Sequence, residues 1–179
     1  MAKRALSMQI NGQAVGPLEV PDDLMMIEFL HEYLNLTGSR LGCGQGVCHA
    51  CVLILDKPDG TSEEMRTCIT GAHFFHGKQV RTIEGLAKRD AAGKVSELNP
   101  VQQKFLEHFS FQCSYCTPGY VNAATIMVEK LQRQKVLRSE LDDEIEDALG
   151  QHICRCTGYV RYYQAAKLVL EDLGLVREG

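Results

Sequence analysis

The sequence contains no tryptophan, and its 23 acidic side chains outnumber its 19 basic ones, which gives a net charge of −4. That balance provides no basic surface of the kind that binds nucleic acid. No apolar run approaches the roughly 20 residues that a membrane-spanning helix needs. The Lys3-Arg4 pair has no apolar stretch behind it, so the pattern of a secretory or twin-arginine signal is missing. We therefore expect no nucleic-acid partner, no membrane span and a cytoplasmic location. Export in complex with a signal-bearing partner would instead place the chain in the periplasm.

Cysteine is the residue type that stands out, with eight copies in 179 residues. In a reducing compartment, clustered thiols hold metal far more often than they form disulfides. Hydrophobic residues make up 45% of the chain, enough for a packed core and too many for a disordered segment. The sequence therefore predicts a folded, metal-binding protein.

The first part of the chain, residues 1–86, has the pattern of a small mixed sheet. Apolar residues alternate from Leu6 to Ile10, and the Asn11-Gly12 pair then predicts a tight hairpin. Residues 22–34 predict one helix, capped by Asp22 or Asp23. Further strands are expected at residues 51–55, 63–66 and 79–83.

The second part, residues 97–179, has helical periodicity and predicts a four-helix bundle. Between the two parts, residues 87–96 are charged and aperiodic, which predicts a linker. The first helix begins with Asn99 as its N-cap and Pro100 at its first position. The other three are expected at residues 118–134, 139–150 and 157–173. The fold class is therefore α+β, with two domains at 1–86 and 97–179.

Three cysteines share one glycine-rich loop, Gly42 to Cys51, with the spacing C-x4-C-x2-C formed by Cys43, Cys48 and Cys51. Plant-type [2Fe–2S] ferredoxins use this spacing with a fourth cysteine further along, and Cys68 can fill that role. Glycines let the backbone curl around a cluster and point N–H groups at sulfur. A zinc site more often has two short cysteine pairs. The glycine string also lacks the spacing of a phosphate-binding loop.

The other four cysteines form two short pairs, Cys113/Cys116 and Cys154/Cys156. Both pairs are predicted near helix N-termini, where free N–H groups favour anionic thiolates. Structural zinc is an open alternative for this set taken alone.

The motifs Gln112–Gly119 and Cys154–Tyr159, together with the first loop and Cys68, resemble the iron–sulfur portion of the xanthine dehydrogenase/aldehyde oxidoreductase family of molybdenum hydroxylases. The resemblance covers nearly the whole chain, which looks like a separate small subunit. It implies a β-grasp ferredoxin-like domain followed by a helical domain, each with one [2Fe–2S] cluster. The implied ligands of the distal cluster are Cys43, Cys48, Cys51 and Cys68, and those of the proximal cluster are Cys113, Cys116, Cys154 and Cys156.

The same resemblance implies a partner for each end of an electron path. A large subunit would hold a molybdopterin-type cofactor in its cytosine dinucleotide form. Gln112 would hydrogen-bond the pterin of that cofactor, and Cys156 would be the cluster ligand nearest to the pterin. Electrons from aldehyde or N-heterocycle oxidation would pass through both clusters to an FAD subunit or another acceptor. No catalytic residue or substrate site is expected on this chain.

Two residues depart from the family pattern, which usually has glycine at both places: His49 and Ser114. Each must then tolerate an unusual backbone angle, and we expect His49 to face solvent. His152 is a weaker candidate for a hydrogen bond near the second set. His73 and His76 are expected to be structural, and residues 142–147 to form a solvated acidic helix face. We expect packing or interface roles for Tyr159, Tyr162 and Tyr163.

The alternatives at this point are a stand-alone two-cluster ferredoxin and a ferredoxin domain joined to a structural zinc module.

Overall fold

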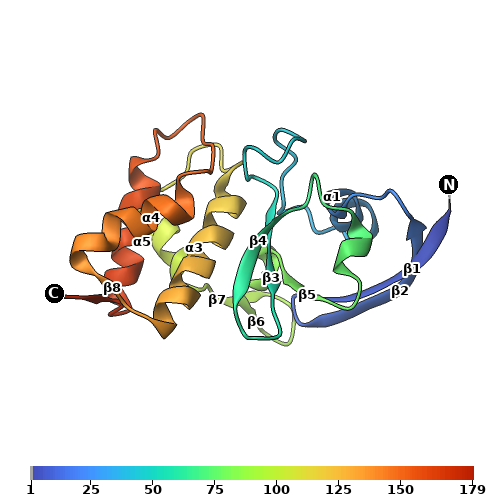
Figure 1. Cartoon of the computed structure of the whole chain (residues 1–179), viewed down its shortest axis with the longest axis horizontal. Coiled ribbons are helices and arrows are strands. Elements are labelled where there is room, and N and C mark those ends of the chain that lie inside the picture. Colours follow the sequence, from blue (N-terminus) through green and yellow to red (C-terminus); the bar gives the residue numbers. More distant parts are fainter. Residues whose placement is uncertain (1) are drawn as a thin grey trace.

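The computed structural model describes residues 2–179 and shows a sheet half beside a helical half (Figure 1). The sheet half consists of a five-stranded sheet, in the order β2-β1-β5-β3-β4, and one short helix. Its strands are β1 (Lys3–Ile10), β2 (Gln13–Pro21), β3 (Val52–Asp56), β4 (Ser62–Arg66) and β5 (Gln79–Arg81). The helical half consists of α2 (Pro100–Glu107), α3 (Thr117–Arg133), α4 (Leu141–Leu149) and α5 (Val160–Asp172). The α+β content expected from the sequence is confirmed.

The predicted hairpin joins β1 and β2 through Asn11 and Gly12, whose φ angles are +54° and +79°. Two positive φ values in succession give a turn whose twist matches that of antiparallel strands. In this sheet β1 pairs in parallel with β5, whereas the other neighbouring strands are antiparallel. The strand core packs against buried side chains that include Phe29 and Phe75.

The predicted helix at residues 22–34 is wrong in its start and its type. The helix α1 (Met26–Glu28) begins at Met26 and continues as a π-helical turn through Phe29–Tyr33. Met25 is the N-cap, and its backbone N–H donates to the Glu28 carboxylate at 3.1 Å. Asp22, one of the two predicted caps, instead accepts a hydrogen bond from the side chain of Arg4 in β1.

The helical bundle has the four expected helices with corrected ends. Asn99 caps α2, since its side chain accepts from the Gln102 backbone N–H at 2.7 Å. The third helix does not begin at Ser139, because a 3₁₀ turn at Arg138–Glu140 precedes α4. The fourth begins at Val160 rather than near residue 157, because Tyr159 has a φ of +72°. The strands β8 (Val136–Leu137) and β9 (Val176–Arg177) pair beside the bundle.

The expected linker at residues 87–96 is partly wrong, because most of it forms a small exposed hairpin. Its strands are β6 (Lys88–Arg89) and β7 (Val95–Glu97). The Asp90 carboxylate closes the turn by accepting from the backbone N–H groups of Ala92 and Lys94, each at 2.9 Å. Since Ile83 and Leu86 already pack against the helical core, the domain limits of 86 and 97 stay a prediction.

Helix α3 connects the two halves, because it packs on β3 and β4. The Asn122 side chain donates to the Val52 carbonyl at 2.8 Å, and Arg81 of β5 donates to the Glu129 carboxylate at 2.6 Å. A Cβ at Gly119 would lie 2.2 Å from the His49 carbonyl oxygen, so only glycine permits this approach. The start of α3 is thereby held against the first cysteine loop. No helix in residues 2–179 is both long and apolar enough to span a bilayer.

Candidate iron–sulfur sites

The first cysteine set comes together at one end of the sheet half. Cys43, Cys48 and Cys51 lie in the loop before β3, and Cys68 follows β4. Cys43 and Cys48 lie close enough to shift each other's pKa, and Cys51 and Cys43 both act on the pKa of Cys68. The four side chains predicted as one ligand set are therefore neighbours.

Positive φ angles curl this loop. Gly44 and Gly46 have φ values of +67° and +72°, and His49 also adopts a left-handed φ of +57°. A Cβ on Gly46 would meet the end of the exposed Ile69 side chain at 2.4 Å, so a larger residue there would displace Ile69 in addition to straining the backbone. The curled backbone points N–H groups at sulfur, and the Gln45 N–H lies 3.3 Å from Cys43 Sγ. Hydrogen bonds from the Gln45 and Cys48 backbone lower the pKa of the Cys43 thiol to about 6.

The second set is built from two segments far apart in the sequence. Cys116 is the N-cap of α3, as predicted, whereas Cys154 and Cys156 lie in the turn between α4 and α5. The sulfurs of Cys113 and Cys156 are 3.5 Å apart, and the thiols of Cys116 and Cys154 are also in contact. All eight cysteines are free thiols in the described chain.

The second set has a buried side and an exposed side. Burial raises the pKa of the Cys116 thiol to about 12. Burial also acts to raise the pKa of Cys154, but hydrogen bonds from Thr157, whose Oγ1 is 3.0 Å from the sulfur, outweigh it and lower that pKa. Cys113, Cys156 and the neighbouring Gln112 are exposed. The exposed side is the one at which another protein could reach the sulfurs.

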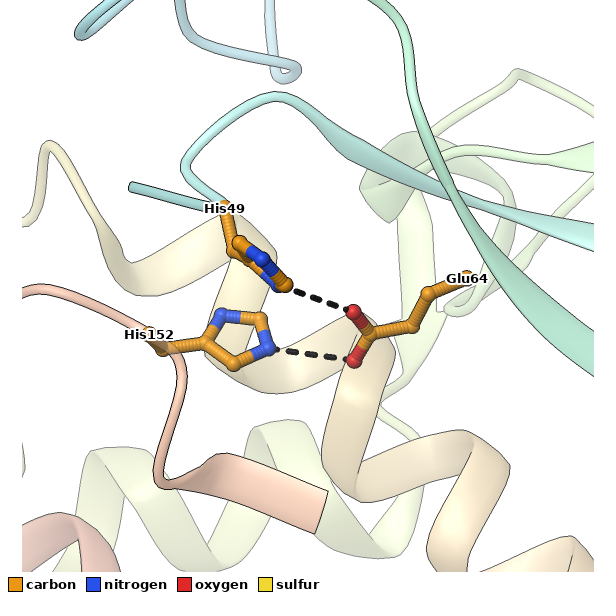
Figure 2. Close-up of side chains that lie close together, drawn as sticks. All are labelled: His49, Glu64 and His152. Carbon is orange, nitrogen blue, oxygen red and sulfur yellow. Dashed lines mark hydrogen bonds and ion pairs between the residues drawn. The ribbon is translucent and has the colours of Figure 1, made fainter. Parts of the chain in front are cut away.

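His49 does not face solvent, and that expectation is wrong. Only 6% of His49 is exposed, and its Nδ1 lies 3.2 Å from the Glu64 carboxylate. His152, 2% exposed, bonds the other oxygen of the same carboxylate at 3.1 Å (Figure 2). Burial lowers the pKa of His49, whereas the two rings outweigh burial at Glu64 and lower the pKa of its carboxyl. Sequence reasoning missed Glu64, because only strand pairing brings it beside His49.

The remaining candidates take structural roles. Ser114 adopts the expected unusual backbone angle, with φ of +59°. His73 bonds the Pro21 carbonyl and His76 accepts from the Ser7 N–H, so these two histidines have different partners. Tyr162 is fully buried and stacks on Tyr120 with ring centres 4.0 Å apart, which confirms its packing role. The acidic run is partly exposed on α4, as expected, with Glu144 paired to Lys130.

Four thiols at each of two places, with hydrogen-bond donors aimed at sulfur, fit iron–sulfur clusters and define an iron–sulfur protein. Comparison with known proteins supports this class. Residues 82–167, which include the whole second set, match the family model of a [2Fe-2S] binding domain.

The chain belongs to the xanthine dehydrogenase/aldehyde oxidoreductase family, in which it has the form of a small iron–sulfur subunit. It is 34% identical to a probable xanthine dehydrogenase subunit of Bacillus subtilis, over 96% of this chain and 88% of that one. It is 31% identical to rat aldehyde oxidase 1 over 90% of this chain but spans only 12% of that protein. Quinoline 2-oxidoreductase of Pseudomonas putida contains a chain that superimposes with a TM-score of 0.78 at 29% identity, covering 96% of each.

Proposed function

We propose that this chain is the electron-transfer subunit of a molybdenum-containing oxidoreductase and that it holds two [2Fe–2S] clusters. The observation that carries the proposal is the gathering of all eight cysteines into two groups of four. One cluster is assigned to Cys43, Cys48, Cys51 and Cys68, and the other to Cys113, Cys116, Cys154 and Cys156. Each cluster, when bound, accepts and returns a single electron, whereas the substrate is oxidised on a partner subunit.

The contacts within each group suggest which cysteines share an iron. In a [2Fe–2S] cluster held by four thiolates, each iron takes two of them. The thiol contacts pair Cys43 with Cys48 and Cys51 with Cys68. In the second group they pair Cys113 with Cys156 and Cys116 with Cys154. One iron of the second cluster would thus sit on the exposed pair and the other on the buried pair.

The exposed pair marks the side on which the large subunit would dock. Large apolar side chains close to this pair in the sequence are exposed, led by Phe109 at 70% and Val160 at 60%. Apolar side chains exposed together mark protein contacts. A docked large subunit would bring its pterin cofactor, of molybdopterin type, to Gln112 and Cys156. The cytosine dinucleotide form of that cofactor is part of the proposal.

The first cluster would pass electrons onward. Val47 lies in its loop and Ile69 lies beside Gly46 of that loop; both side chains are more than half exposed and provide a second apolar contact area. An FAD subunit or another acceptor would dock there. In this scheme the sheet half is the β-grasp ferredoxin-like domain, residues 1–86, and the helical half is the proximal cluster domain, residues 97–179. The assembled enzyme would oxidise an aldehyde or an N-heterocycle.

Metal analysis of the purified chain tests the cluster assignment. About four irons and four acid-labile sulfides per chain are expected, with two distinct electron paramagnetic resonance signals after dithionite reduction. About two irons, one signal and zinc bound by sulfur would contradict it, because the second set would then be a structural zinc module.

Co-expression tests the partner assignment. The chain should elute with a large subunit in size-exclusion chromatography. Substitution of Val160 by aspartate should release the chain from the large subunit. No iron should be lost, because Val160 is exposed and does not ligate a cluster. A chain that keeps all its iron and never copurifies with a large subunit would favour a stand-alone ferredoxin.

A further inference from the structure

His49, Glu64 and His152 form a buried group that the electron-relay proposal does not use. They come from three places: the first cysteine loop, strand β4 and the turn after α4. Figure 2 shows both imidazole rings directed at one carboxylate, with each ring facing a different oxygen. One ligand-type atom from each residue can be chosen so that all three lie within 4.8 Å of one another. Two imidazoles and one carboxylate form a donor set that divalent first-row metals prefer.

We propose that His49, Glu64 and His152 bind one divalent ion of the zinc type, through His49 Nδ1, the Glu64 carboxylate and His152 Nε2. The two nitrogens are 3.2 and 3.1 Å from the carboxylate oxygens. Ligand atoms around a tetrahedral zinc with bonds of about 2.0–2.1 Å are themselves about 3.3 Å apart. The present spacing therefore accepts an ion after small side-chain movements.

Hydrogen bonding within the group leaves one buried nitrogen unused. The two imidazole contacts to Glu64, at 3.2 and 3.1 Å, lie within the ordinary range of N–H···O hydrogen bonds. His152 Nδ1, however, is buried without a hydrogen-bond partner among the described residues. The hydrogen-bonding capacity of the group is therefore incompletely used.

A pocket gives the ion a route and room for a water ligand. It has a volume of about 260 Å³ and is lined by His49, Glu64, Met127 and Asp147, among others. Three protein ligands and one open position are the arrangement of zinc sites that keep a water. Asp147 on the pocket wall adds negative charge where a cation would enter, whereas the charge of Glu144 is paired with that of Lys130, which lines the same pocket.

The surrounding charges have two adverse members, Lys130 on the pocket wall and Arg66 beside His49. Arg66 Nη1 lies 3.4 Å from His49 Nε2 and opposes a cation there. Arg66 is an exposed residue whose other contact, to the Gly46 carbonyl, is also 3.4 Å long, so its side chain can turn into solvent. On the favourable side, the site lies between the two cysteine sets, since His49 adjoins Cys48 and His152 precedes Cys154. This last argument rests on the proposed function: if both cysteine sets hold four-thiolate clusters, the clusters would add negative charge on both sides of the ion.

Zinc binding to the full chain with its iron in place is the test. After removal of loosely held metal with a chelator, equilibrium dialysis against micromolar Zn²⁺ should load about one zinc per chain while the iron content stays constant. X-ray absorption at the zinc edge should show only nitrogen and oxygen ligands, at about 2.0–2.1 Å, and no sulfur at about 2.3 Å.

Variants assign the bound zinc to these residues. Glu64→Gln keeps the side-chain shape and should weaken zinc binding at least tenfold, and His152→Asn should do the same. Glu63→Gln, on the same strand, and His73→Asn, a histidine outside the group, are matched controls and should bind zinc as the parent does. Equal binding by Glu64→Gln and Glu63→Gln would overturn the proposal.

Two further outcomes separate this inference from the proposed function. Full iron content with no zinc bound at micromolar concentration would overturn the metal site and leave the two-cluster assignment intact. Zinc bound by sulfur together with lost iron would count against the second cluster. If no nitrogen-ligated zinc were found in the same sample, the result would also overturn the site at His49, Glu64 and His152.

Discussion

The two cysteine sets hold the same number of thiols but are built in different ways. Three members of the first set share one short loop, where positive φ angles at Gly44 and Gly46 direct backbone N–H groups at sulfur. The second set joins the N-terminus of α3 to the turn after α4, so its geometry depends on how the helices pack. The first site is thus specified mainly by local backbone conformation and the second mainly by tertiary structure.

The thiol chemistry does not follow this difference, because each set contains thiols shifted in both directions. In the first set, backbone hydrogen bonds lower the pKa of Cys43 to about 6, whereas burial raises the pKa of Cys68 to about 11. In the second set, burial is outweighed at Cys154 by hydrogen bonds from Thr157, which lower its pKa, whereas burial raises the pKa of Cys116 to about 12. At each site the thiols with a raised pKa must lose a proton when a metal binds.

Removal of one cysteine from each set is the strongest way to separate the two sites. Cys116→Ser should lose the iron of the second set, about half of the total, because a four-thiolate cluster needs all its ligands. Cys43→Ser should lose the other half. Iron content and electron paramagnetic resonance of the reduced variants measure this, and each should keep one of the two signals. Loss of all iron in either variant would mean that the sites do not form independently.

Gly119→Ala should damage the contact between the two sites most severely among substitutions that leave the cysteines alone. Its new Cβ would lie 2.2 Å from the His49 carbonyl, which is backbone and cannot rotate away. We expect a loss of about 3 kcal/mol in the free energy of unfolding, measured by denaturant titration.

Gly60→Ala is the matched control for Gly119→Ala. Gly60 has a φ of +81° but open space around it, so only the backbone strain of about 1 kcal/mol should be lost. Equal losses in the two variants would show that α3 does not press on the first loop as the structure indicates.

The local character of the first site explains why much of it could be predicted from the sequence. The spacing of Cys43, Cys48 and Cys51 and the glycines between them are short-range features, as are the Asn11-Gly12 turn and the Asn99 cap. The helix at residues 22–34 was mispredicted for the opposite reason. Its aspartates are good caps in isolation, but Asp22 pairs with Arg4, and a bridge to Gly71 holds Met25 extended.

The buried group around Glu64 lay beyond sequence reasoning for a related reason. His49 lies in a glycine-rich cysteine loop, where Val47 and Ala50 form no periodic pattern that would indicate burial. Its partners come from β4 and from the turn after α4, and both arrive only through tertiary packing. The exposed hairpin at residues 88–97 was missed because strands of two and three residues leave no periodic pattern to detect.

Glu129 tests the connection between the halves through pH. Burial acts to raise the pKa of its carboxyl, but the Arg81 hydrogen bonds outweigh burial and lower it. A carboxyl with a lowered folded-state pKa stabilises the protein above its unfolded pKa, about 4.3, and loses that contribution as the pH falls through the folded value. Glu129→Gln should therefore cost about 2 kcal/mol at pH 7 and progressively less at lower pH. Unfolding titrations of parent and variant from pH 7 to pH 3 measure the difference. A gap of constant size across this range would mean that the Arg81–Glu129 pair does not act through charge.

Tyr162→Phe should have the smallest effect, and it probes the second site alone. The Tyr162 hydroxyl lies 2.7 Å from Thr117 Oγ1 and 3.7 Å from Cys116 Sγ, while its ring stays in the core. Phenylalanine keeps the ring and removes one hydrogen-bonding group, so the free energy of unfolding should fall by about 1 kcal/mol.

If the Tyr162 hydroxyl also donates to Cys116 sulfur in the loaded protein, Tyr162→Phe should lower the reduction potential of the cluster at the second cysteine set, because hydrogen bonds to ligand sulfur stabilise the reduced, more negative form. The reduction potential of the other cluster, at the first cysteine set with its backbone donors, should not change. A shift of both potentials by the same amount would show that the two sites are less separate than their construction implies.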